Sequence, residues 1–264
     1  MGGRSRLKRM LAAAASGVLL AAAFPKLDRW WLVWVALVPL LVVTRGRRPR
    51  AAAGLGLLTG VLFFGILLQW VCLFDCTGWV LLTLWQASYV AAFAVLWVML
   101  APAGPVGWRG ILAPAAAWTA LEWVRSLSRG GFTWGGLAYA LHGQLPLVQL
   151  ASLLGPLGMS FFVVATNAAV AGVVAARADL PERTRALRRL EVVAVLLLAA
   201  WGWGCWRMTR PIAVGPATRV ALLQASLVGE GRDEPWPPEK IEELRKLIPA
   251  AGINLITKVK GEKA

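Results

Sequence analysis

The sequence predicts an all-α polytopic membrane bundle of about seven transmembrane helices, followed by a truncated α/β segment. Two observations predict the bundle: apolar residues make up 58% of the chain and charged residues only 16%, against roughly 45–50% and 25% in soluble domains. A third predicts the segment, because from residue 218 a strand-like run, a helix-like run and a second strand-like run follow one another. We therefore divide the chain into a transmembrane domain, 1–207, and an incomplete second domain, 208–264.

Seven apolar stretches are long enough to cross about 30 Å of hydrocarbon, which takes roughly 20 residues. The second of them is short and contains Pro39, and the sixth is long enough to include a re-entrant or interfacial lead-in, so six or eight spans also fit. The first allows an alternative, a signal peptide, although Phe24-Pro25-Lys26 is a poor cleavage site. The stretches are 7–24, 30–44, 51–74, 79–101, 110–126, 146–176 and 188–206.

The distribution of Arg and Lys predicts the orientation in the membrane. With the N-terminus inside, the internal segments hold 14 of these residues and the external loops hold four, as the positive-inside rule requires. Seven crossings then place 208–264 on the extracytoplasmic side. The net charge of +15 is thereby explained by topology, and we expect no nucleic-acid partner. Many of the 15 Trp residues lie near predicted span ends, where indole suits the headgroup layer.

Several residue types that often carry chemistry give little here. Cys72 and Cys76 flank the outer end of the third stretch, and a disulfide, a metal pair or two buried thiols all fit. No His or further Cys stands nearby to complete a zinc site, so we expect no metal and no cofactor. Gly56 and Gly60 are spaced for close helix contact. His142 lies in an external loop and by itself names no reaction.

Two ionisable residues near the end of the fifth stretch are more informative, because charge at membrane depth is costly and usually has a partner or a function. Glu122 and Arg125 are three residues apart, so a helix places them on one face. An ion pair that fixes the helix end and a role in a lipid-binding site both fit. The glycine-rich loop beyond them carries Phe132, Trp134 and Tyr139, which suit the interface or acyl chains.

A series of short motifs lies along the bundle in the order Glu122-Trp-Val-Arg125, Gly131-Phe-Thr-Trp134, Leu137-Ala-Tyr139, the run from Pro146 to Phe161, and Asn167-Ala-Ala. Phe24-Pro25, the run from Trp34 to Leu40 and the run from Gly60 to Val71 lie before them. Together these motifs resemble the membrane domain of bacterial apolipoprotein N-acyltransferase. The resemblance covers roughly 24–257.

The resemblance implies a function and a location. In that family a transmembrane bundle is joined to an extracytoplasmic nitrilase-like domain, which transfers an acyl chain from a phospholipid to the N-terminal amine of a diacylglyceryl-cysteine lipoprotein. It therefore implies a multi-pass protein of the bacterial cell membrane, with the N-terminus cytoplasmic and the C-terminal segment outside. A phospholipid acyl donor and a lipoprotein acceptor are the implied partners.

The resemblance is incomplete at its C-terminal end. Residues 218–226 match the family's first nitrilase strand and 253–257 the next, at whose end the family carries its catalytic Glu. Glu262 matches that residue only if the alignment slides past Lys258 to Lys260, and the family's catalytic Lys and Cys have no counterpart. We therefore expect this polypeptide alone to lack acyltransferase activity.

Two origins fit this C-terminal end, and an alternative function fits the chain. The lysine-rich last seven residues fit either a frameshift or premature stop, or a natural short protein with its own tail. The alternative function is a non-catalytic membrane anchor or scaffold for a partner enzyme. A transporter or channel lacks support, because acidic residues within the spans are almost absent and no internal repeat is visible.

Overall fold

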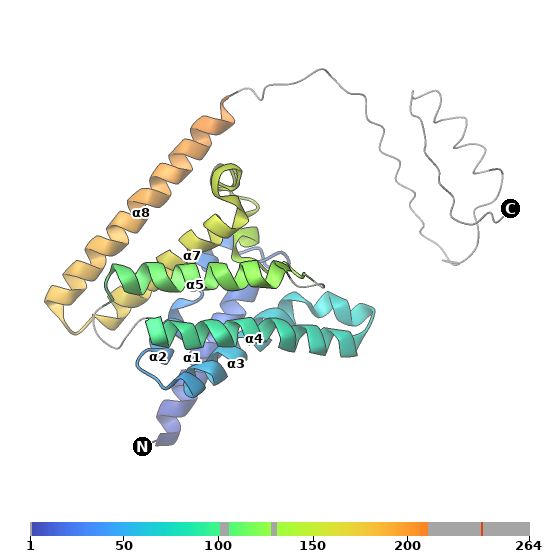
Figure 1. Cartoon of the computed structure of the whole chain (residues 1–264), viewed down its shortest axis with the longest axis horizontal. Coiled ribbons are helices and arrows are strands. Elements are labelled where there is room, and N and C mark those ends of the chain that lie inside the picture. The colour runs from blue at the N-terminus through green and yellow to red at the C-terminus, as the bar shows by residue number, and fades with distance from the viewer. Residues whose placement is uncertain (1, 101–105, 128–130, 211–238, 240–264) are drawn as a thin grey trace. The chain divides into compact units, whose positions relative to one another are not determined.

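The computed structural model describes residues 2–100, 106–127, 131–210 and Glu239, and the regular structure in these residues is helical (Figure 1). The segment predicted as a nitrilase-like start, 208–264, lies outside the described residues except for 208–210 and Glu239. The helices are α1 (Gly2–Ala22), η1 (Trp30–Trp34), α2 (Val38–Thr44), α3 (Pro49–Leu67), η2 (Gln69–Leu73), α4 (Cys76–Leu100), α5 (Trp108–Leu127), η3 (Leu137–Leu141), α6 (Leu145–Val148), α7 (Ala151–Ala175) and α8 (Leu180–Met208).

Helical segments occupy all seven apolar stretches predicted from the sequence. Within the described residues, four helices are long and apolar enough to cross a membrane: α3, α4, α7 and α8. The chain is therefore a helical membrane protein, while the count of seven spans stays a prediction. The other stretches differ for a physical reason, because α1 begins with basic residues, α5 carries Arg109, Glu122 and Arg125, and the second stretch is broken.

Proline and aspartate mark where several of these helices begin. Proline has no backbone N–H and has a helical φ, so it suits the first turn of a helix, and α2, α3, α6 and α8 each carry one there. Asp179 caps α8, since its Oδ1 accepts the backbone N–H of Glu182 at 3.1 Å. Asp75 plays the same part before α4, where its two carboxylate oxygens accept the N–H groups of Thr77 and Gly78.

Glycines allow the N-terminal helices to approach closely. A Cβ built on Gly56 would lie 2.7 Å from the Ala94 Cβ, and one on Gly60 would lie 2.7 Å from the Ala87 Cα, so α3 and α4 are in backbone contact there. This confirms the predicted packing role of the two glycines. Gly17 of α1 makes the equivalent approach to α3, because its Cβ would lie 2.5 Å from the Thr59 carbonyl oxygen.

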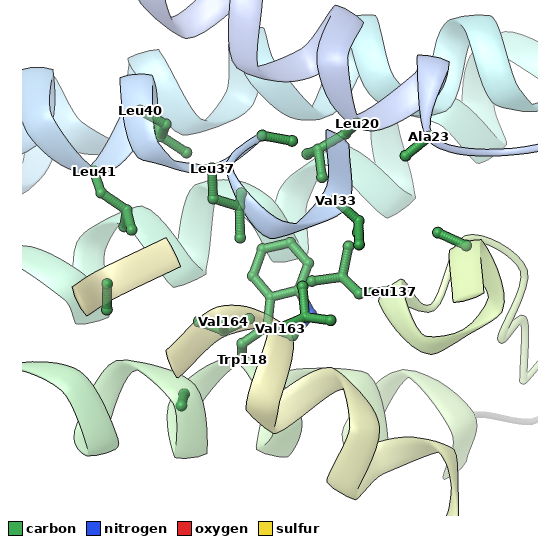
Figure 2. Close-up of a cluster of buried hydrophobic side chains, with 14 of the residues drawn as sticks. Leu20, Ala23, Val33, Leu37, Leu40, Leu41, Trp118, Leu137, Val163 and Val164 are labelled. Carbon is green, nitrogen blue, oxygen red and sulfur yellow. The ribbon is translucent and has the colours of Figure 1, made fainter. Parts of the chain in front are cut away.

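The apolar core draws on α1, η1, α2, α3, α4, α5, η3 and α7. Figure 2 shows the Trp118 ring of α5 among side chains of the other elements, including Leu37, Leu137 and Val163. These residues come from three helices and from the break between η1 and α2, so the core is assembled by tertiary packing. The core supports η3, and the candidate site lies beside η3.

The second predicted span is not one continuous helix. It consists of η1 and α2, separated by Val35 to Leu37, and Asn167 of α7 satisfies the backbone groups that this break releases. Its Oδ1 accepts the Leu37 N–H at 2.9 Å, and its Nδ2 donates to the Val33 carbonyl at 2.9 Å. Unsatisfied backbone groups are very costly at membrane depth, so a wholly buried amide makes the irregular segment tolerable.

Cys72 and Cys76, at the corner between η2 and α4, form a disulfide. The structure thus selects one of the three alternatives that the sequence left open for this pair. Cys205, in α8, is a free cysteine and half-buried.

Candidate functional site

Two ionisable side chains of α5 are buried inside the bundle. Glu122 is 8% exposed and Arg125 is 5% exposed. α5 packs against both α4 and α7, so the face that carries Glu122 and Arg125 is turned toward these helices. Both side chains line the same two cavities, which confirms that they share one face of the helix.

The Glu122 carboxylate fastens the loop after α5 to that helix. Its Oε1 accepts the indole N–H of Trp118, one turn earlier, at 2.9 Å, and the backbone N–H of Leu137 at 2.9 Å. Leu137 is the first residue of η3, where backbone N–H groups have no partner within the helix. Hydrogen bonds to an ionised acceptor are stronger than neutral ones, so Glu122 holds the start of η3 in place.

The Arg125 guanidinium links α5 to α4 and α3. Its Nη1 donates to Oε1 of Gln86, a wholly buried residue of α4, at 3.1 Å. Its Cζ lies 5.5 Å from the centroid of the Phe64 ring of α3, which is a cation–π distance. A buried charge is tolerated only when other groups compensate it, and these contacts do so from two neighbouring helices.

A cavity of ≈ 240 Å³ lies beside Glu122 and Arg125. Its walls are the last turns of α5, the loop with η3, and the first half of α7; they are apolar with a few polar groups, as in ligand sites generally. A smaller cavity of ≈ 20 Å³, with room for about one water molecule, also borders both residues. The larger cavity is lined by Glu122, Arg125, Ser126, Thr133, Gly136, Ala138, Tyr139, Leu154, Gly155, Pro156, Leu157 and Ser160.

Helix α7 is interrupted where it borders the larger cavity. Gly155 has φ 64° and ψ −179°, a conformation that glycine adopts readily and other residues do not, and Pro156 follows it. One turn further on, the buried hydroxyl of Ser160 accepts the backbone N–H of Ala138, in η3, at 3.2 Å. Non-helical backbone at membrane depth is tolerated where protein or a water-filled cavity surrounds it, and the break in α7 meets that condition.

The three aromatic residues predicted near the site have different surroundings. Tyr139 lines the cavity and is 44% exposed. Trp134 does not line the cavity; its ring centroid lies 5.6 Å from that of Trp70, and both rings are partly exposed. Phe132 is partly buried against the apolar core. Of these three, Tyr139 is therefore the one that lines a cavity with Glu122 and Arg125.

Other predicted residues lie away from this site or outside the described chain. Glu262, the residue matched to a catalytic Glu, lies outside the described residues. His142 is exposed, as predicted, and its Nε2 lies 3.8 Å from Oδ1 of Asp28. Within the described residues there is no group of three or more His, Cys, Asp or Glu side chains that would hold a metal ion.

The cavity is lined by both polar and apolar side chains. The guanidinium of Arg125 is a planar donor that suits phosphate and carboxylate groups, and the hydroxyl groups of Ser126, Thr133 and Tyr139 add hydrogen-bonding capacity. Leu154 and Leu157 supply an apolar wall. The carboxylate of Glu122 already accepts two hydrogen bonds from the protein, so its evident role is to position η3.

Several residues that build the site were not singled out from the sequence. Gln86 is a polar residue within an apolar stretch, a signal that could have drawn attention to it. The Gly155-Pro156 dipeptide is a typical helix-breaking pair. Trp118 and Ser160 carry no such local signal, because their importance comes from hydrogen bonds to Glu122 and to Ala138.

Comparison with known proteins gives consistent results. The family model described as "Apolipoprotein N-acyltransferase N-terminal domain" matches residues 16–169, which include α5 and the cavity. The chain is 30% identical over 249 residues to an apolipoprotein N-acyltransferase of Gloeobacter violaceus, covering 89% of this chain and 46% of the relative. It is 31% identical over 248 residues to the protein of that name from Chromobacterium violaceum, covering 88% and 45%. The chain thus spans about half the length of the curated relatives it matches.

Proposed function

This chain belongs to the apolipoprotein N-acyltransferase family, and on that premise we propose that its bundle binds an acyl chain of the phospholipid donor in the cavity between α5, η3 and α7. One observation carries the proposal: an apolar cavity of ≈ 240 Å³ lies beside a buried arginine at a break in a membrane helix. Such a site accepts a molecule that is apolar along most of its length and charged at one end.

The lining residues fit the two parts of a phospholipid. Leu154, Leu157 and Ala138 offer the apolar wall for methylene groups, whose burial stabilises by about 0.8 kcal/mol each. Arg125 offers hydrogen-bond donors to the phosphate or the ester carbonyl. Tyr139, half-exposed, lies where an amphipathic ring suits the boundary between acyl chains and headgroups. Phe132 and Trp134, in the same loop, we assign to anchoring that loop at the interface.

The reaction that we propose for the whole family member is acyl transfer to a lipoprotein. A Cys thiol, whose proton a Glu accepts, attacks the phospholipid ester to form a thioester, the lysophospholipid leaves with that proton, and a Lys stabilises the oxyanion. The N-terminal amine of the diacylglyceryl-cysteine then attacks the thioester and regenerates the thiol. These groups belong to the nitrilase-like domain. We identify 208–264 with the start of that domain and match Glu262 to its catalytic Glu. Inactivity of this polypeptide alone stays a prediction.

We assign the chain to the bacterial cell membrane with seven crossings, the N-terminus in the cytoplasm and 208–264 outside. The basic residues within 45–50 and 177–189 support this orientation. Reporter fusions after Arg45, Ala176 and Arg210 test it. Periplasmic activity from the third fusion and cytoplasmic activity from the first two are expected, and the reverse pattern would contradict the orientation.

Photocrosslinking tests the lipid-binding proposal directly. The purified chain is incubated in mixed micelles with phosphatidylethanolamine that carries a diazirine on one acyl chain, irradiated, and mapped by mass spectrometry. We expect crosslinks in the peptides that hold residues 133–139 and 154–160, and we expect unlabelled phosphatidylethanolamine to compete for them. Crosslinks spread evenly over the outward faces of α4 and α8, without competition, would overturn the proposal.

A matched pair of substitutions on α5 makes this test specific. Ser126→Trp places an indole at the cavity wall, whereas Val124→Trp places it on the exposed surface of the same helix, away from the cavity. The first variant should lose the competed crosslinks and the second should keep them. If a partner enzyme that acts on lipids co-purifies and neither variant alters crosslinking, the alternative holds, and the bundle is a non-catalytic anchor or scaffold.

A further inference from the structure

Arginines crowd the segments that precede α3 and open α8. Four of them lie within residues 45–50, which cover the turn after α2 and the first residues of α3, and five more lie within 177–189. All but Arg45 and Arg189 are exposed, and these two are partly buried. Neither the cavity beside Glu122 nor the fold of the core uses these exposed groups.

One buried carboxylate pairs with two of these arginines. Glu182, 7% exposed, lies 3.2 Å from Nη1 of Arg185 and 3.0 Å from Nη1 of Arg189. The Arg189 Nη1 also donates to the Val106 carbonyl at 2.9 Å. Burial lowers the pKa of Arg45, and the charge of Glu182 opposes that shift, so the 45–50 turn lies within electrostatic range of the start of α8.

These ion pairs leave an excess of positive charge at the start of α8. Two guanidinium groups, those of Arg185 and Arg189, pair with the Glu182 carboxylate, and Arg183 and Arg188 add two exposed charges on the same helix. Exposed like charges repel one another and need counter-ions. The exposed arginines of these segments therefore suit an extended anionic partner better than a single small ion.

Apolar side chains beside the arginines indicate which kind of anionic partner this surface contacts. Leu180 is 71% exposed and Leu187 is 46% exposed, and both lie among the arginines at the start of α8. Basic and apolar side chains on one helical segment suit the boundary between headgroups and acyl chains. The rest of α8 is long and apolar enough to cross a membrane, which places the arginines at headgroup level.

We propose that the arginines of 45–50 and 177–189, with Leu180 and Leu187, form a basic surface that binds the headgroups of anionic phospholipids. This lipid site is separate from the donor cavity and does not depend on the proposed function. Each arginine near an anionic surface contributes about fivefold to binding. A lipid surface bound there bridges the α2–α3 turn and the start of α8.

Lipid titration of the purified full chain in phosphatidylcholine nanodiscs tests the proposal. Phosphatidylglycerol replaces phosphatidylcholine stepwise, and the melting temperature is followed by tryptophan fluorescence. The double variant Arg183→Gln/Arg188→Gln removes two exposed charges without touching the Glu182 network. The control, Arg183→Lys/Arg188→Lys, changes the same two side chains and keeps their positive charge.

We expect phosphatidylglycerol to raise the melting temperature of the wild type and the control in a salt-sensitive manner. The double variant should need about 25-fold more of the lipid for the same shift, from about fivefold per arginine. Equal shifts with phosphatidylcholine, or an unchanged response of the double variant, would overturn the proposal. An identical shift with millimolar inorganic phosphate alone would also overturn it, since the surface would then bind free anions. None of these outcomes bears on crosslinking at the donor cavity.

Discussion

The contact between α3 and α4 supports a quantitative prediction for Gly60→Ala. The added Cβ would lie 2.7 Å from the Ala87 Cα and 3.0 Å from the Ala87 carbonyl oxygen. Both atoms belong to the backbone of α4, so no side-chain rotation relieves the contact. The helices must separate by about 0.7 Å to bring 2.7 Å up to the 3.4 Å of an ordinary contact, and overpacking of this kind typically costs about 1–3 kcal/mol.

Gly54→Ala is the matched control, because it makes the same chemical change on the same helix. A Cβ at Gly54 meets nothing within 4 Å, and alanine favours a helix over glycine by about 1 kcal/mol. The double variant Gly60→Ala/Ala87→Gly should recover only part of the loss, since the contact with the Ala87 Cα remains. The measurement is the unfolding free energy in mixed micelles by titration with SDS, followed by tryptophan fluorescence.

The difference between the two single variants isolates the contribution of helix packing to stability. We expect Gly60→Ala to lose about 1–3 kcal/mol and Gly54→Ala to be unchanged or slightly more stable. Equal stability of the two single variants would refute the reasoning, because it would mean that α3 and α4 are not in backbone contact at Gly60. Full recovery in the double variant would show that the Ala87 methyl group, rather than the backbone, makes the contact.

Three further predictions concern hydrogen bonds and backbone conformation. Glu122→Ala leaves two buried N–H groups without an acceptor, which should lower the free energy of unfolding by about 2–6 kcal/mol, at about 1–3 kcal/mol each. Glu122→Gln keeps an acceptor oxygen and serves as the control. Hydrogen exchange of the Leu137 amide should accelerate in the first variant and much less in the second. Asn167→Leu removes three hydrogen bonds and should lower the free energy of unfolding by about 1 kcal/mol for each of them, which the melting temperature would report. A melting temperature equal to that of the wild type would contradict the role of Asn167. Gly155→Ala has open space for its methyl group but a φ of 64°, so it should cost about 1–2 kcal/mol; Gly143→Ala, which also has open space and no positive φ, should be neutral, and equal effects of the two would argue against the break in α7.

Most of the bundle could be predicted from local sequence. The positions of the helices follow from apolar runs, because a helix satisfies its backbone groups within itself and hydropathy therefore reports it directly. The shared face of Glu122 and Arg125 follows from the helical repeat alone. The packing role of Gly56 and Gly60 could be predicted for the same reason, although their partners on α4 could not.

The interruptions and the cavity could not be predicted in this way. The break between η1 and α2 is stable because Asn167, 130 residues further on, accepts the N–H of Leu37. Which aromatic residue of the loop after α5 lines the cavity also depends on the fold, which places Trp134 against Trp70 and brings Tyr139 to the cavity. Such partners lie in other helices, and periodicity within one segment carries no information about them.

The sequence by itself determined that this protein is a helical membrane bundle of the apolipoprotein N-acyltransferase family, because composition, apolar length and motifs are local properties. Only the tertiary structure decided where the bundle is hollow and how its irregular segments are satisfied. A carboxylate that reaches η3, an amide that bridges a broken span and a cavity at Gly155 each depend on helices that meet in space. The free energy of a buried polar group depends on the partner that packing supplies, and that partner is chosen by the fold.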